Sequence, residues 1–103
     1  MPYHLKLTRL ADQDFDQILD YTLVTWGETQ YCKYRDLMLE AFAAIIDEPL
    51  LLKSKERDDL HDGIRTYPAG SHFLIYRISQ SDVTVVRILH QQMDLPQHLE
   101  ALD

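Results

Sequence analysis

The sequence predicts an α+β fold: an N-terminal strand, an antiparallel helical hairpin, a three-stranded antiparallel sheet and a short C-terminal helix. Amphipathic periodicity over residues 10–47 indicates the two helices, and runs of β-branched and aromatic residues broken by turn formers over residues 63–94 indicate the sheet. A chain of 103 residues, 46% of them hydrophobic, has the size and composition of one domain spanning residues 1–103. It has no run of about 18 apolar residues, so we expect no membrane span.

The N-terminal part begins with an edge strand at Tyr3–Leu7, where apolar and polar side chains alternate. Thr8 can cap the helix that follows, which runs from Leu10 to Trp26 and ends at Gly27. The N-terminal residues show no long apolar stretch and no small-residue cleavage site, so we expect no signal peptide. The predicted inward positions of the first helix are Ala11, Phe15, Ile18, Leu19, Thr22 and Trp26.

A second helix is predicted from about Thr29 to about Asp47, with Pro49 after its end. Only a few residues separate it from the first helix, so the two must pack as an antiparallel hairpin. The single cysteine, Cys32, fits a reducing cytoplasm and is predicted to be a small core residue rather than a nucleophile. The predicted inward stripe is Cys32, Tyr34, Met38, Ala41, Phe42 and Ile45.

The stretch from Gly63 to Asp94 predicts three strands joined by two tight turns. In the middle strand, regular alternation places Leu74, Tyr76 and Ile78 on one face and Phe73, Ile75 and Arg77 on the other. In the last strand, it places Val83, Val85, Arg87 and Leu89 on one face and Thr84, Val86 and Ile88 on the other. Both faces are apolar, and the sheet therefore needs two covers, of which the hairpin supplies one. Residues 50–62 are predicted to be a loop with one extra helical turn.

After the last strand, Asp94 and Gln97 indicate the start of a C-terminal helix, with Leu95, Leu99 and Leu102 along one side. His90 and Asp94 lie four residues apart at this point. Two interpretations remain open: a polar clamp that fixes the C-terminal turn, or contact residues for a partner, together with His98.

Charge is distributed unevenly along the chain. The net charge of −7 argues against direct nucleic-acid binding. Residues 10–48 hold nine acids against two bases, whereas residues 63–93 hold three bases against one acid. An anionic peptide is therefore attracted to the sheet. Arg65, Arg77 and Arg87 form either a solvated face or, as we favour, part of a partner-binding face.

No motif predicts catalysis, a metal or a cofactor. The five histidines are scattered, without cysteines or carboxylates at the spacing of metal ligands. The single glycines Gly63 and Gly70 stand at turns and do not form a phosphate-binding loop.

Several segments resemble the ParE branch of the RelE/ParE toxin superfamily: LTRLADQDFDQILDYTLVTWG, Gly63-Ile-Arg65, GSHFLIYRI and VVRILHQQMDLPQHL. The resemblance covers nearly the whole chain and implies a cytoplasmic toxin that inhibits DNA gyrase by protein–protein contact, without enzymatic activity. It also implies a ParD-type antitoxin whose C-terminal segment supplies the second cover of the sheet. The predicted antitoxin-binding residues are Arg65, Phe73, Ile75, Tyr76, Arg77 and Arg87, and His90, Asp94 and His98 are candidates for target contact or for the C-terminal clamp.

Two alternatives stand beside this interpretation. The RelE branch cleaves mRNA with basic residues that fall here at about Thr66, Pro68, Phe73 and Gln92, none of which is basic. Phosphodiester cleavage needs acid–base groups and stabilisation of the developing charge, so an mRNA interferase is disfavoured. The other alternative is a relative that binds an antitoxin and is no longer toxic.

Overall fold

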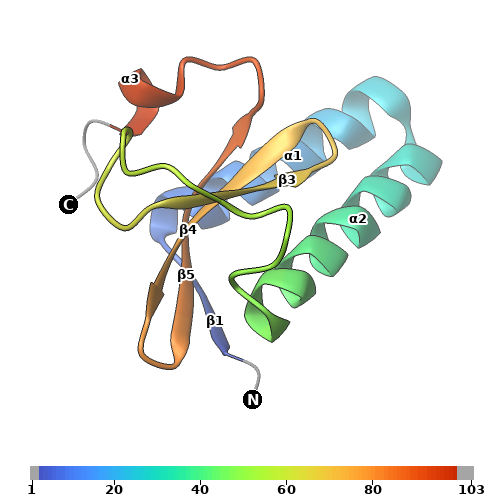
Figure 1. The fold of residues 1–103 in the computed structure, drawn as a ribbon. Coiled ribbons are helices and arrows are strands. Elements are labelled where there is room, and N and C mark those ends of the chain that lie inside the picture. Colours follow the sequence, from blue (N-terminus) through green and yellow to red (C-terminus); the bar gives the residue numbers. More distant parts are fainter. Residues whose placement is uncertain (1–2, 100–103) are drawn as a thin grey trace.

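A five-stranded mixed sheet carries two long helices on one of its faces (Figure 1). The strand order is β1-β5-β4-β3-β2; β1 runs parallel to β5, and the other neighbours are antiparallel. The computed structural model describes residues 3–99. The elements are β1 (His4–Leu7), α1 (Arg9–Trp26), α2 (Glu28–Asp47), β2 (Lys55–Glu56), β3 (Arg65–Ala69), β4 (His72–Ser79), β5 (Asp82–His90) and α3 (Leu95–Leu99).

The predicted α+β class and order of elements are confirmed, but the sheet is larger than predicted. The N-terminal strand β1 pairs with β5, and the two-residue strand β2 forms within the predicted loop and pairs with β3. Within residues 3–99, no helix is long and apolar enough to cross a membrane.

The helical hairpin begins and turns where the local signals indicate. The Thr8 hydroxyl oxygen accepts the N–H of Ala11 at 3.1 Å, which caps α1. Gly27, at φ 90°, ends α1 and precedes α2 directly. The predictions for Trp26 and Cys32 are wrong, because Trp26 is 68% exposed and Cys32 is also exposed. Burial along α1 ends at Thr22 and resumes in α2 only at Met38, so the tip of the hairpin lies outside the core.

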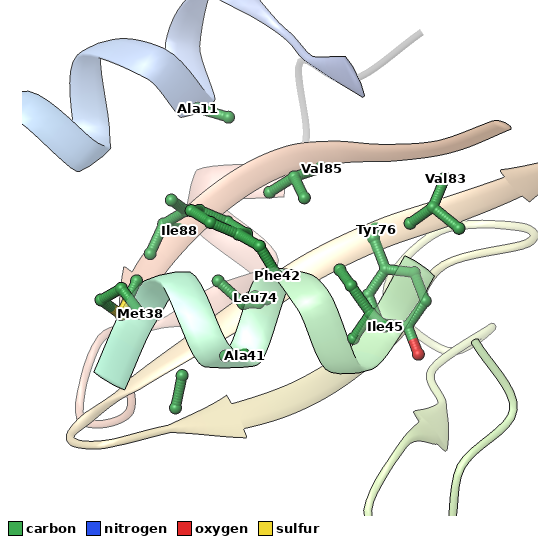
Figure 2. Packing of buried hydrophobic residues seen from close by; sticks show 11 residues of the cluster. Ala11, Met38, Ala41, Phe42, Ile45, Leu74, Tyr76, Val83, Val85 and Ile88 are labelled. Atoms are coloured by element: carbon green, nitrogen blue, oxygen red, sulfur yellow. The ribbon is translucent and has the colours of Figure 1, made fainter. Parts of the chain in front are cut away.

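The main core lies between the hairpin and the sheet (Figure 2). Phe15 of α1 meets Phe42 of α2 edge to face, with ring centroids 5.4 Å apart. The buried residues of this main core are Ala11, Met38, Ala41, Phe42, Ile45, Ala69, Leu74, Tyr76, Val83, Val85 and Ile88. Burying these side chains supplies most of the free energy that holds α1 and α2 against the sheet.

A β-bulge breaks the alternation of β5. Ile75 is opposite Arg87 while Tyr76 is opposite Val85, which leaves Val86 as the extra residue. The faces predicted for β4 are confirmed. Val86 lies on the face opposite Val85, as predicted. Beyond Val86 the prediction for β5 is wrong, because Ile88 joins the core beneath the helices and Leu89 joins Val86 on the opposite face.

The chain covers the second face of its own sheet. Ile64, which precedes β3, and Leu95 and Leu99 of α3 form a second buried cluster with Ile75, Val86 and Leu89; Leu60 and Phe73 pack against it. The prediction that a partner must supply this cover is therefore wrong for the middle of the sheet. The predicted position of Leu95 and Leu99 on one side of a helix is confirmed, and Leu102 lies outside the described residues.

Candidate partner-binding groove

A groove of about 1110 Å³ lies where β5 continues past the end of β1. The last pair between these strands is Leu7 with Val85. Thr8 closes the ladder, since its N–H donates to the carbonyl of Val85 (3.0 Å) and its hydroxyl to that of Val86 (2.8 Å). The groove is lined by Asp14, Gln17, Ile18, Tyr21, Thr22 and Trp26 of α1, Gln30 and Tyr34 of α2, Ser71 and His72, Arg87, Ile88, Leu89 and His90 of β5, and Met93 and His98.

Asp14 of α1 takes the place of a strand partner along this edge. Its carboxylate accepts Nε and Nη2 of Arg87 at 2.8 and 3.0 Å, and the backbone N–H of Ile88 at 3.0 Å. The hydrogen bond to Asp14 is the main cause of a raised pKa at Arg87, which therefore stays charged. Both side chains are mostly buried. The prediction that Arg87 is available to the carboxylates of an antitoxin is not met in this structure, because Asp14 already occupies its guanidinium.

Tyr34, His72 and His90 form the polar end of the groove. The Tyr34 hydroxyl lies 2.5 Å from Nδ1 of His72 and accepts the N–H of Ser71 at 3.1 Å. His72 and His90 are opposite each other on β4 and β5, with ring centroids 5.2 Å apart. Burial, and secondarily His90, lower the pKa of His72 to about 4, so its ring is neutral at pH 7.

Large apolar side chains form the rim of the groove. Tyr21 is 65% exposed and Met93 44%, and the exposed Trp26 stands on the same side. Ile88 and Leu89 line the groove below them. Exposed aromatic and methionine side chains around an apolar floor are typical of protein–protein interfaces.

The predicted antitoxin-binding residues do not form one surface. Ile75 and Tyr76 are 0% exposed, so the prediction that they contact a partner is wrong for this structure. Arg65 donates from Nε to Ser54 Oγ at 2.8 Å and is paired with Glu56. For Phe73 and Arg77, both half-buried, antitoxin contact stays a prediction.

The C-terminal candidates are only partly brought together. His90 and His98 line the groove, and Asp94 is exposed outside its lining. No hydrogen bond joins His90 to Asp94 within residues 3–99; Nδ1 of His90 instead accepts the backbone N–H of Gln92 at 3.1 Å. The clamp interpretation is therefore wrong as stated, since a backbone donor two residues away takes the ring nitrogen.

Sequence reasoning missed Asp14 although a signal was present. Asp12, Asp16 and Asp20 follow one another at four-residue spacing on the exposed side of α1. Asp14 lies instead four residues before Ile18, on the side that packs inward. A carboxylate on the apolar side of a helix needs a cationic partner, and Arg87 is that partner.

Among the described residues, no group of three or more His, Cys, Asp and Glu could hold a metal ion.

The fold of the chain is that of solved toxins. It superposes with a TM-score of 0.71 on a chain of the chromosomal ParDE toxin–antitoxin system from P. aeruginosa, at 22% identity, covering 85% of this chain and 95% of that one. For a chain of the RelBE2 toxin–antitoxin complex from Mycobacterium tuberculosis the TM-score is 0.61 at 23% identity, covering 88% and 100%. These likenesses place the structure among ParE- and RelE-type folds.

Sequence similarity narrows this class to one family. The family described as "ParE toxin of type II toxin-antitoxin system, parDE" matches residues 5–95. Toxin ParE1 of Caulobacter vibrioides is 33% identical over 98 residues, or 95% of this chain and 97% of that protein. Toxin ParE1 of Mycobacterium tuberculosis is 32% identical over 94 residues, or 90% and 94%. The chain belongs to the ParE family of toxins of type II toxin–antitoxin systems.

Proposed function

We propose that this protein is a toxin that acts in the cytoplasm on DNA gyrase through protein–protein contact, without catalysing a reaction of its own. We further propose that a ParD-type antitoxin neutralises it by placing a segment in the groove beside β5. Family membership over residues 5–95 carries the first part of this proposal. The groove, with its exposed aromatic rim, carries the second.

The groove suits a peptide segment for two physical reasons. Tyr21, Trp26 and Met93 leave large apolar surfaces in contact with water, and covering them is favourable. Among the strands of residues 3–99, β5 has no neighbour on this side beyond Val86, so backbone groups of an extended segment can pair with the part of this edge that Asp14 does not occupy. The antitoxin-containing systems of the structural relatives agree with a peptide partner.

The residues of the sheet support a non-enzymatic mode of action. At the positions where the RelE branch carries basic groups, Thr66 is buried and Phe73 packs against the second core. The Asp14–Arg87 pair is the main charged group in the groove, and it is internally neutralised. Stabilising a phosphorane needs unpaired cationic donors, and these positions supply none.

The deciding experiment induces the protein alone in a bacterial host. We expect growth arrest, accumulation of DNA breaks, trapping of purified gyrase on cleaved DNA, and no cleavage of ribosome-bound or free mRNA. Co-expression of a ParD-type antitoxin should restore growth. Site-specific mRNA cleavage by the pure protein would contradict the proposal, and normal growth on induction would favour the non-toxic relative.

A matched pair of variants on α1 tests the position of the antitoxin. Trp26→Ala removes a rim side chain of the groove, whereas Val24→Ala changes an exposed side chain outside its lining. Losing an aromatic anchor should weaken antitoxin binding at least about tenfold, and the Val24 variant should bind within about twofold of the original. Equal affinities of the two variants would remove the antitoxin from this groove.

A further inference from the structure

Two imidazole rings stand side by side in the groove, and each uses its Nδ1 atom within its own chain. His72 and His90 are opposite residues of β4 and β5, with ring centroids 5.2 Å apart and planes at 79°. Nδ1 of His72 is 2.5 Å from the Tyr34 hydroxyl, and Nδ1 of His90 is 3.1 Å from the backbone nitrogen of Gln92.

These two contacts indicate which ring nitrogens carry the hydrogens. A backbone N–H can only donate, so Nδ1 of His90 is an acceptor. The Tyr34 oxygen already accepts the N–H of Ser71. Its own hydrogen has three acceptors within reach, Nδ1 of His72 at 2.5 Å, Oγ of Ser71 at 3.3 Å and the carbonyl of Ala69 at 3.4 Å, and Nδ1 of His72 is the nearest. A neutral imidazole whose Nδ1 accepts carries its hydrogen on Nε2. Both rings therefore present an Nε2–H donor.

Both Nε2–H donors are open to a ligand. Neither Nε2 atom makes a hydrogen bond to any residue of the described range 3–99. In the same range, no buried side-chain nitrogen or oxygen lacks a partner. The two Nε2 atoms are consequently in contact with solvent, and both belong to residues that line the groove.

The charges around the rings favour an anionic acceptor. Asp14 of α1, which lines the groove together with the two rings, is neutralised by Arg87 of β5. Tyr34 of α2 is a neutral donor, and His98 of α3 adds a third imidazole to the lining. Because Asp14 is already neutralised, a proton taken up by an imidazole here would give this part of the groove a net positive charge.

We propose that His72 and His90 form a carboxylate-binding subsite of the groove, in which their two Nε2–H groups donate to the side-chain carboxylate of an Asp or Glu residue of the bound partner. The subsite deepens the proposed function, on which the identity of the partner rests. A carboxylate accepts two N–H donors at once, and its charge favours the protonated imidazole. Bound carboxylate should accordingly raise the pKa of His72.

The test uses N-acetylglutamate N-methylamide as the probe and its glutamine analogue, which has the same shape without the charge, as the control. Long-range ¹H–¹⁵N NMR near pH 7 should show the Nε2–H tautomer at both rings. The glutamate probe should shift their Nε2 signals in a saturable manner, leave the signal of the exposed His4 of β1 unchanged, and raise the pKa of His72. The glutamine analogue should bind at least about tenfold more weakly.

Two substitutions at one position separate the donor from the rest of the ring. His90→Gln can keep a donor near the Nε2 position, whereas His90→Asn keeps only a group near Nδ1. We expect the glutamate probe to bind His90→Gln within about threefold of the original and His90→Asn at least about tenfold more weakly. A Nδ1–H tautomer at either ring, a shift of His4 equal to that of His72, or equal affinities of the two variants would overturn the subsite. Toxicity and gyrase play no part in this measurement, so its outcome is independent of the proposed function.

Discussion

The ion pair between Asp14 and Arg87 should be one of the single interactions that contribute most to the free energy of unfolding of this protein. It joins residues 73 apart in the sequence, and the same carboxylate also holds the N–H of Ile88. Removing one partner of a fully buried ion pair costs about 3–5 kcal/mol. Here 17% of the Arg87 side chain and 12% of the Asp14 side chain are exposed, so solvent compensates part of the loss. We expect Asp14→Asn to cost about 2 kcal/mol and Asp14→Ala about 3 kcal/mol.

Urea unfolding followed by circular dichroism measures this cost, with an unchanged m-value as the sign that the unfolding transition itself is the same. In a domain of this size, a loss of 2 kcal/mol corresponds to a fall in Tm of roughly 8–16 °C. The matched control is Lys6→Gln, which breaks the exposed pair between β1 and β5 at Asp82 (3.1 Å; Lys6 62% exposed). An exposed pair contributes less than about 1 kcal/mol.

A double-mutant cycle with Asp14→Ala and Arg87→Ala isolates the interaction from other effects of each substitution. We expect a coupling free energy of at least about 1 kcal/mol. If Asp14→Asn costs no more than Lys6→Gln, or if the two alanine substitutions are additive, the account of Asp14 as the cap of the β5 edge is refuted.

Three further predictions concern a turn, the core and the groove. Gly70→Ala should destabilise by more than about 1 kcal/mol, because Gly70 is at φ +60° and an added Cβ would lie 2.7 Å from the Tyr34 ring; Gly63→Ala, at φ +74° with open space, should cost clearly less in the same urea assay. Tyr76→Phe should lower the free energy of unfolding by about 1–3 kcal/mol, because it removes a buried hydroxyl that donates to the carbonyl oxygen of Pro49 at 2.6 Å. Unchanged stability would contradict this prediction. The lowered pKa of His72 means that, between pH 6.5 and about 4, the unfolded chain binds a proton that the folded chain does not. This contribution to stability is present above pH 6.5 and is lost as the pH falls toward 4, by roughly 1 kcal/mol after allowance for solvent screening at a half-buried ring. His72→Asn should show a correspondingly smaller loss in urea unfolding over this pH range, and an identical pH profile would contradict the prediction.

Local signals were sufficient for most of the fold. Thr8 caps α1 through its own side chain, and Gly27 adopts the positive φ that separates the helices. The alternation along β4 could be read directly, because no bulge interrupts that strand. Cys32 was misassigned because helical periodicity shows which residues share a side, and does not show how far the sheet extends beneath the helix.

The groove was harder to predict, because its parts are distant in sequence. His72 and His90 lie in separate strands, and only the register of β4 with β5 places one ring beside the other. Arg87 was identified as more than a surface cation, but its partner lies in α1, and only the tertiary structure shows that pairing. Sequence patterns give the faces of elements; which faces meet depends on register, and a single extra residue changes it.

The extra residue Val86 connects the cover of the sheet with the formation of the groove. With regular alternation, Arg87 would follow Val83 and Val85 onto the face beneath the helices, and an unpaired cation in that core would be costly. The bulge gives that place to Ile88 and leaves Arg87 beside Asp14 at the edge. It also coincides with the end of β1 pairing, whose last partner is Val85. Bulges increase the local twist of a strand and interrupt its ladder. The edge of β5 beyond Val86 therefore binds Asp14 instead of a strand, and by our proposal an antitoxin segment lies beside Asp14.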